Sequence, residues 1–186
     1  MNKLIKKQIK KIKEFALRYY KTLDETHGLE HAKRTVKLAE YLAKKEGAKL
    51  QIVRLGALLH QFHNGKIVEK FLRKIKVEEE MKNQLVHCVK CASTMNIHEA
   101  KTIEAKVVYD ADRLQVIGPF GIIREIGYDI GARKIKFREA IKHTRTISQK
   151  FYNTLQTKTA KKLAKNLHRF SLKFWKIFDK WDKAKL

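Results

Sequence analysis

Apolar residues return at every third or fourth position through nearly the whole chain, and lysines fill many of the positions between them. This spacing places apolar side chains along one face of an α-helix. A half-buried β-strand would instead alternate apolar and polar residues, and the sequence gives no such signal. The single proline, Pro119, together with Gly121 predicts a turn. The pattern therefore predicts an all-α fold, a helical bundle.

The expected helices follow one another with short connections. After a first helix, Asp24 or Thr26 is expected to cap a second helix, and Gly47 is expected to end it, because glycine favours the left-handed conformation found after many helices. The stripe of apolar residues over 160–181 predicts a long C-terminal helix. Between these helices, four more are expected over residues 50–59, 67–75, 81–91 and 100–117.

Positive charge is concentrated at the two ends of the chain. The 186 residues include 43 Lys and Arg against 19 Asp and Glu, a formal net charge of +24. Residues 1–21 carry +7 and residues 130–186 carry +14, whereas the centre is nearly balanced. A field of this size attracts polyanions such as RNA. The alternative is a lysine-rich surface of the thermophile kind, although glutamate, which normally accompanies it, is not enriched here.

The length fits one domain. We expect a single domain over residues 1–186, with a core of about 20–130, a basic helical segment over 1–21 and basic helices over 130–186. The chain has no apolar run near the roughly 20 residues of a transmembrane helix and no signal-peptide pattern at its N-terminus. We therefore expect a cytoplasmic location. Cys88 and Cys91 lack the second cysteine pair of a structural zinc site, so two buried helix residues are the favoured interpretation.

Histidines occur at helical spacing in three places. His27 and His31 are four residues apart and share a helix face, while His60 and His63 are three apart. His87 lies one turn before a cysteine. Each of them alone is compatible with an ordinary buried residue. Together, histidines on helices that pack against one another could bind a metal ion.

Two carboxylates interrupt an apolar helix in the segment VVYDADRL. Asp110 and Asp112 lie about 200° apart around a helix, so only one of them is expected to face inward. A buried carboxylate needs a hydrogen bond, an ion pair or a metal ion, because burying it alone is too costly. An inward aspartate could thus complete a metal site with the histidines.

Five segments resemble one known family. They are THGLEHAKRTVKLAEYLAKKEGA, LGALLHQFHN, LVHCVK, TIEAKVVYDADRLQVIGPFGIIRE and the tail TKTAKKLAKNLHRF. Together they resemble the HD superfamily of metal-dependent phosphohydrolases, and in particular its small stand-alone predicted hydrolases of bacteria and archaea. The resemblance covers roughly residues 20–180 and implies a single HD-like helical domain.

The family pattern is a histidine, a His–Asp doublet and a distant aspartate, which bind a divalent metal. In this chain His31, His60 and Asp112 match the first histidine, the start of the doublet and the distant aspartate. The resemblance implies manganese, magnesium, iron or another divalent ion, or an empty site. It also makes Arg34 a candidate for holding the substrate phosphate and His63 a candidate substitute ligand. Asp110 and His87 are weaker ligand candidates.

The chain departs from the pattern at four places. Gln61 stands where the doublet has aspartate, and a neutral amide is a poorer ligand for a divalent ion than a carboxylate. The segment CASTMN lacks the further histidine that relatives carry near position 92. Gln115 replaces an acidic residue, and Pro119 with Phe120 replaces a small one. These departures favour a degenerate HD domain that is catalytically inactive or impaired.

Two functions therefore remain open. The first is binding of RNA or a ribonucleoprotein, such as the ribosome, by the basic ends of a pseudoenzyme. The alternative is a metal-dependent phosphohydrolase of nucleotides or other phosphate esters, acting through His31, His60 and Asp112. A membrane-surface role of the amphipathic N-terminal segment is less economical than a first helix packed on the domain. The expected RNA contacts are Lys6, Lys7, Lys10, Lys158, Lys161, Lys162, Lys165, Arg169, Lys173 and Lys176.

Overall fold

Every regular element in residues 5–184, the part of the chain that the structure describes, is helical. The structure is a computed structural model. It confirms the all-α prediction and the long C-terminal helix. None of the described helices has the length and apolar character needed to cross a membrane. The outermost residues of the two basic ends, 1–4 and 185–186, lie outside the described residues.

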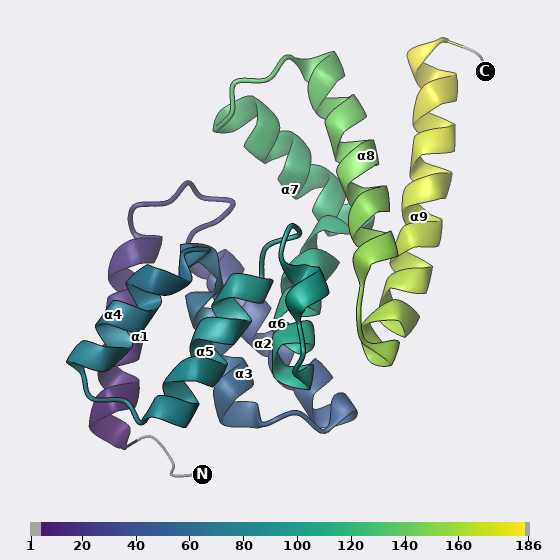
Figure 1. Cartoon of the computed structure of the whole chain (residues 1–186). Helices are drawn as coiled ribbons and strands as arrows, with labels where there is room; N and C mark the ends of the chain where they lie inside the picture. The colour runs from purple at the N-terminus through teal and green to yellow at the C-terminus, as the bar shows by residue number, and fades with distance from the viewer. Residues whose placement is uncertain (1–4, 185–186) are drawn as a thin grey trace. The chain divides into compact units, whose positions relative to one another are not determined.

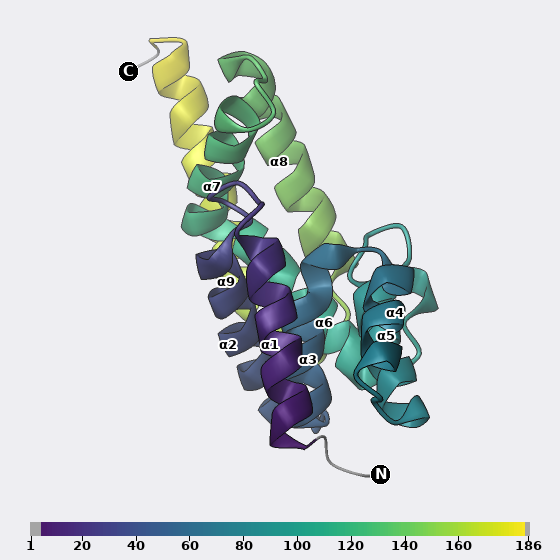
Figure 2. The same ribbon diagram turned by 90° about the vertical axis from the view of Figure 1, so that its left-hand side faces the viewer.

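The chain forms two units, Met1–Asp112 and Arg113–Leu186. In the first unit, α1, α2 and α3 lie side by side, and α5 packs against α3 and α4 (Figure 2). The single domain expected over residues 1–186 stays a prediction. The helices that begin in the first unit are α1 (Lys6–Tyr20), α2 (Leu29–Glu46), α3 (Leu50–Leu59), α4 (Gly65–Lys74), α5 (Glu79–Cys91) and α6 (Ile103–Arg113).

Helix α2 ends as the sequence predicts but begins later. Gly47 adopts a left-handed φ of 71°, which a residue without Cβ accepts without strain. The expected cap at Asp24 or Thr26 is wrong, because Gly28 is the residue before the helix. Asp24 instead closes the preceding turn, where its Oδ1 accepts hydrogen bonds from the backbone N–H groups of Thr26 at 2.9 Å and His27 at 3.3 Å.

Helices α3 and α5 approach closely at Gly56. A Cβ at Gly56 would lie 2.9 Å from the Cβ of Cys88, so only glycine fits there without a shift. Cys88 and Cys91 are both buried and carry free thiols, as expected for two helix residues of the core. Burial raises the pKa of the Cys88 thiol well above its usual range.

The second unit is a three-helix arrangement of α7 (Gly118–Gly131), α8 (Phe137–Thr154) and α9 (Lys158–Asp182), which run alongside one another (Figure 1). Ile122, Ile141 and Trp175 form its apolar centre. The turn expected at Pro119 and Gly121 is wrong, because both residues lie in the first turn of α7. Proline is tolerated there, since the first N–H groups of a helix have no intrahelical partner.

Candidate metal centre

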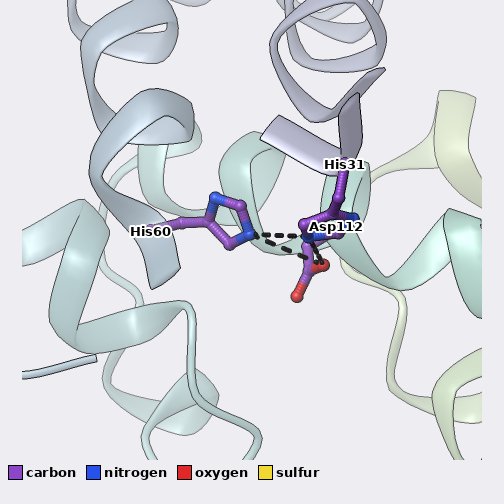
Figure 3. A group of neighbouring side chains, drawn as sticks. All are labelled: His31, His60 and Asp112. Carbon is purple, nitrogen blue, oxygen red and sulfur yellow. Dashed lines mark hydrogen bonds and ion pairs between the residues drawn. The ribbon is translucent and has the colours of Figure 1, made fainter. Parts of the chain in front are cut away.

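Three side chains from different helices converge in the first unit (Figure 3). His31 lies in the first turn of α2, His60 follows the last residue of α3, and Asp112 lies near the end of α6. The two Nε2 atoms of the histidines are 3.1 Å apart. Asp112 Oδ1 lies 3.3 Å from Nε2 of His31 and 3.7 Å from Nε2 of His60. We call His31, His60 and Asp112 the triad.

The triad is withdrawn from solvent. Both histidines are fully buried, and Asp112 is 4% exposed. A carboxylate in such a place needs a charged or hydrogen-bonding partner, because its desolvation is costly. Nε2 of His31 and Nε2 of His60 lie 3.3 and 3.7 Å from this carboxylate. The sequence therefore places a polar, charge-bearing cluster among helices that are otherwise packed through apolar side chains.

A backbone carbonyl sets the tautomer of His60. Its Nδ1 donates a hydrogen bond to the carbonyl oxygen of Ala57, one turn earlier, at 2.6 Å. Since a carbonyl oxygen only accepts, the proton stands on Nδ1 and the lone pair stands on Nε2, which faces the other triad residues. Histidines that bind metal ions are commonly oriented in this way by a carbonyl or carboxylate behind them.

The donor set and its spacing fit a divalent cation. Ligand atoms about 2.1 Å from one ion lie roughly 3.0–3.4 Å from each other in tetrahedral or octahedral arrangements. The separations within the triad, 3.1, 3.3 and 3.7 Å, are close to that range. Imidazole nitrogen and carboxylate oxygen suit zinc, manganese and iron. The triad is thus a group of three residues that could hold a metal ion.

Comparison with known proteins identifies the fold around this centre. The model of the HD domain matches residues 28–117, a segment that contains all three triad residues. Residues 28–117 are an HD domain. The resemblance to the HD superfamily inferred from the sequence motifs is thereby confirmed.

Similar chains come from bacilli. The Bacillus subtilis protein YpgQ is 28% identical over 172 residues, which cover 83% of each chain. The crystal structure of YpgQ in complex with ADP has a TM-score of 0.74 at 26% identity and covers 90% of this chain and 96% of YpgQ. An HD-superfamily hydrolase from Bacillus thuringiensis has a TM-score of 0.70 at 27% identity, over 95% of this chain and 99% of its own.

The second position of the HD doublet is occupied by Gln61, whose amide is engaged outside the triad. Its Oε1 accepts a hydrogen bond from Nε2 of His63 at 3.2 Å. The residue is 7% exposed, and its backbone carbonyl accepts a hydrogen bond from the Tyr19 hydroxyl at 3.2 Å. His63, the candidate substitute ligand, is exposed, has a φ of 50° and is not among the three converging residues.

Asp110 and Asp112 are both buried, so the expectation that only one of them faces inward is wrong. The helix that carries them is buried on more than one side, and only Asp112 belongs to the triad. His87 lies on α5, where Nε2 accepts the backbone N–H of Lys101 at 3.2 Å. Arg34 is half-buried one turn after His31 on α2. Of the ligand candidates, the structure thus gathers the triad and leaves Asp110, His63 and His87 outside it.

A hydrogen-bonded pair lies beside the triad. The imidazole of His27 has its ring centre 5.9 Å from that of His31, and its Nδ1 lies 3.0 Å from Oδ2 of Asp24. Partial burial alone would raise the pKa of Asp24, but hydrogen bonds from Thr26 and the neighbouring His27 outweigh it and hold that pKa below its usual value. The carboxylate therefore stays charged and fixes the orientation of the His27 ring.

Tyr20 is a neighbour of the triad that its sequence position did not reveal. Its hydroxyl donates to the carbonyl oxygen of Leu58 at 3.0 Å. Burial, followed by the negative charge of Asp112, raises the pKa of this phenol far above its usual value. Tyr20 is therefore a neutral hydroxyl at any physiological pH. Its place near Asp112 depends on the packing of α1, which the spacing of residues along the sequence does not encode.

Proposed function

We propose that this chain is a divalent-metal-dependent phosphohydrolase that acts on nucleotides. The observation that carries the proposal is the convergence of two buried imidazole nitrogens and one carboxylate oxygen within 3.1–3.7 Å. The HD domain and the hydrolase named among its structural relatives support this reaction class. The ADP complex of YpgQ supports nucleotides as the substrate class.

Each triad residue has a definite part in this proposal. His31, His60 and Asp112 would hold the ion. When bound, such an ion polarises a phosphate oxygen and lowers the pKa of bound water, which provides a nucleophile near neutral pH. The hydrogen bond from Nδ1 of His60 to the carbonyl of Ala57 orients the ring so that Nε2 faces the other two triad residues. Asp24 holds the ring of His27 beside His31, where that imidazole can contact a bound substrate.

Because Gln61 stands where the HD doublet has aspartate, the ligand set carries one negative charge fewer, while His31, His60 and Asp112 are retained. A site of two neutral imidazoles and one carboxylate holds a divalent ion with a net charge of about +1, which favours an anionic substrate. The same loss weakens attraction for the cation. The proposal therefore includes weaker metal binding than a complete doublet would give.

The test is phosphate release from a panel of nucleoside mono-, di- and triphosphates with Mn²⁺ or Mg²⁺ added. We expect activity that requires the ion and falls at least 100-fold in His60→Ala. The matched control is His98→Ala, since His98 is exposed and lies outside the triad. No hydrolysis of any of the nucleotides by the metal-supplemented wild type, or equal activity in His60→Ala, would overturn the proposal.

We also propose a second function, binding of RNA through α9. The supporting observation is a basic stripe along this 25-residue helix. At 100° per residue, six exposed cations of α9 fall within an arc of about 80°, and Lys161 lies just outside it. We call these six the basic stripe: Lys158, Lys162, Lys165, Arg169, Lys173 and Lys176.

The carboxylates of α9 do not neutralise the basic stripe. Asp179 accepts two hydrogen bonds from Arg145 of α8, and Asp182 accepts one from Arg138 of the same helix. The cations thus form a continuous row that suits successive phosphates of a nucleic-acid backbone. Lys6, Lys7 and Lys10 of α1 are also exposed, and their contact with RNA stays a prediction.

The test of RNA binding is its dependence on salt. Binding of a structured RNA should weaken steeply between 50 and 200 mM salt, because each phosphate contact releases a counterion. The triple variant Lys162→Gln, Arg169→Gln, Lys173→Gln should lower the slope of log K against log salt by about 2. The control triple variant Lys44→Gln, Lys45→Gln, Lys74→Gln removes equal charge elsewhere. Equal slopes in both triple variants would contradict the proposal. Binding to anionic vesicles without binding to RNA would contradict it too.

A further inference from the structure

A cleft of about 570 Å³ opens at the start of α4, and it is lined by three basic side chains. His63 lies just before the helix, Lys66 lies in its first turn, and Lys90 reaches the cleft from the end of α5. The volume lies within the roughly 300–1,000 Å³ of typical small-molecule sites. The proposed hydrolase mechanism gives this cleft no role.

The packing of α4 on α5 brings Lys90 to the cleft. A Cβ at Gly65 would lie 2.8 Å from Cγ of Lys90 and 3.3 Å from Cγ1 of Val86. The glycine therefore leaves room for the aliphatic part of Lys90 to lie across the start of α4. Asn96 also lines the cleft, and its Nδ2 donates to the backbone carbonyl of Lys90 at 3.2 Å.

The charge of the cleft favours an anion. Among the described residues that line it, Glu69 is the one carboxylate, and Arg73 donates two hydrogen bonds to its Oε1 at 2.7 and 3.1 Å. The charges of Lys66 and Lys90 therefore dominate. The cleft also lies at the positive end of the α4 dipole, which adds to the attraction for a phosphate.

The cleft adjoins the triad through a short piece of backbone. The N–H of His63 donates to the carbonyl oxygen of His60 at 3.2 Å, and its ring donates to Gln61. The residue that lines the cleft is thus hydrogen-bonded to the turn that carries a triad histidine. The turn over residues 60–63 thus carries a triad histidine at one end and a lining residue of the cleft at the other.

We propose that this cleft binds a second phosphate group of the substrate, so that the chain prefers nucleoside di- and triphosphates to monophosphate esters. This inference rests on the proposed function and adds the substrate class. Lys66 and Lys90 supply the charge, as point cations on flexible stems. Both are positioning and binding residues, and neither belongs to the triad.

The direct test is calorimetric titration with inorganic pyrophosphate, without added metal, at about 0.15 M salt. The double variant Lys66→Met, Lys90→Met should bind at least tenfold more weakly than the wild type. The control double variant Lys44→Met, Lys70→Met loses the same charge from exposed positions outside the cleft, and its affinity should change less than twofold. Equal affinities in the two double variants would overturn the assignment, as would an absence of pyrophosphate binding by the wild type.

Kinetics separates this inference from the proposed function. In the cleft variant, KM for a nucleoside diphosphate should rise about tenfold while KM for the monophosphate stays unchanged. If hydrolysis requires the metal ion but KM is equal in both double variants, the proposed role of the cleft is overturned and the proposed hydrolase function stands. If pyrophosphate binding depends on Lys66 and Lys90 but the wild type hydrolyses no nucleotide, the cleft is an anion site and the proposed hydrolase function is overturned.

Discussion

Gln61 Oε1 accepts a hydrogen bond from His63 Nε2 at 3.2 Å. Gln61 directly follows His60, which belongs to the triad. The bond joins an amide and an imidazole at the position where an HD doublet has its carboxylate. It gives position 61 a structural partner in place of a cation. The local backbone supports this arrangement, since His63 takes a left-handed φ of 50°, which histidine tolerates better than most residues.

Restoring the carboxylate should therefore strengthen the metal site. We expect Gln61→Asp to bind Mn²⁺ roughly tenfold or more tightly than the wild type, because an anion replaces an amide next to the triad. Isothermal titration of both proteins gives the comparison. Asn83→Asp, which adds the same charge on an exposed part of α5, should leave the affinity unchanged. An unaltered affinity in Gln61→Asp would show that position 61 does not reach the ion.

Gly56 tests the close contact of α3 with α5. Gly56→Ala should lower the free energy of unfolding by about 1–3 kcal/mol, because the added Cβ would meet Cys88 at 2.9 Å. Gly127 of α7 is the matched control, since a Cβ there would meet nothing within 4 Å. Gly127→Ala should raise stability by about 0.5–1 kcal/mol through helix propensity. Urea denaturation measures both, and a stabilised Gly56→Ala would contradict the described packing.

The apolar pattern predicted most helix positions, because burial of one face is a local property of the sequence. The range expected over residues 50–59 coincides with α3, and Gly47 ends α2 as its backbone freedom suggests. The turn expected at Pro119 was wrong for a physical reason, since proline suits the first turn of a helix as well as a turn. The cap of α2 was misplaced for a similar reason, since Asp24 suits a turn as well as a helix cap and here closes the turn before Gly28.

The family motifs located the triad, but the chemistry around it required the structure. The carbonyl of Ala57 that sets the tautomer of His60 is a backbone group, which any residue would provide. The approach of Tyr20 depends on how α1 packs. The burial of Asp110 together with Asp112 required knowing that α6 is covered on more than one side. Each of these depends on tertiary contacts that spacing along one helix cannot show.

Asp24 should make stability depend on pH. Its pKa in the folded protein is lower than the 3.8 of the unfolded chain, so its contribution is present above pH 3.8 and is lost as the pH falls through the folded value. The difference in free energy of unfolding between the wild type and Asp24→Asn should therefore be larger at pH 7 than at pH 3. Thermal denaturation of both proteins at the two pH values measures it. A difference that grows on acidification would contradict the sign.

The two thiols should be inert in the folded protein. Burial raises the pKa of both Cys88 and Cys91, so little thiolate forms near neutral pH and reagents cannot reach Cys88. We expect less than one thiol per chain to react with a disulfide reagent within minutes at pH 7.5. Both should react after denaturation. Rapid modification of two thiols in the native protein would show that α5 is more open than described.

Titration of metal-free protein with Mn²⁺ measures directly whether the triad holds a divalent ion. We expect one ion bound per chain in the wild type and none in Asp112→Asn, which keeps the shape of the side chain and removes its charge. Circular dichroism should show the same helix content in both proteins, so that loss of binding reports the site. No uptake by the wild type, or the same uptake by Asp112→Asn, would show that the triad does not hold a divalent ion.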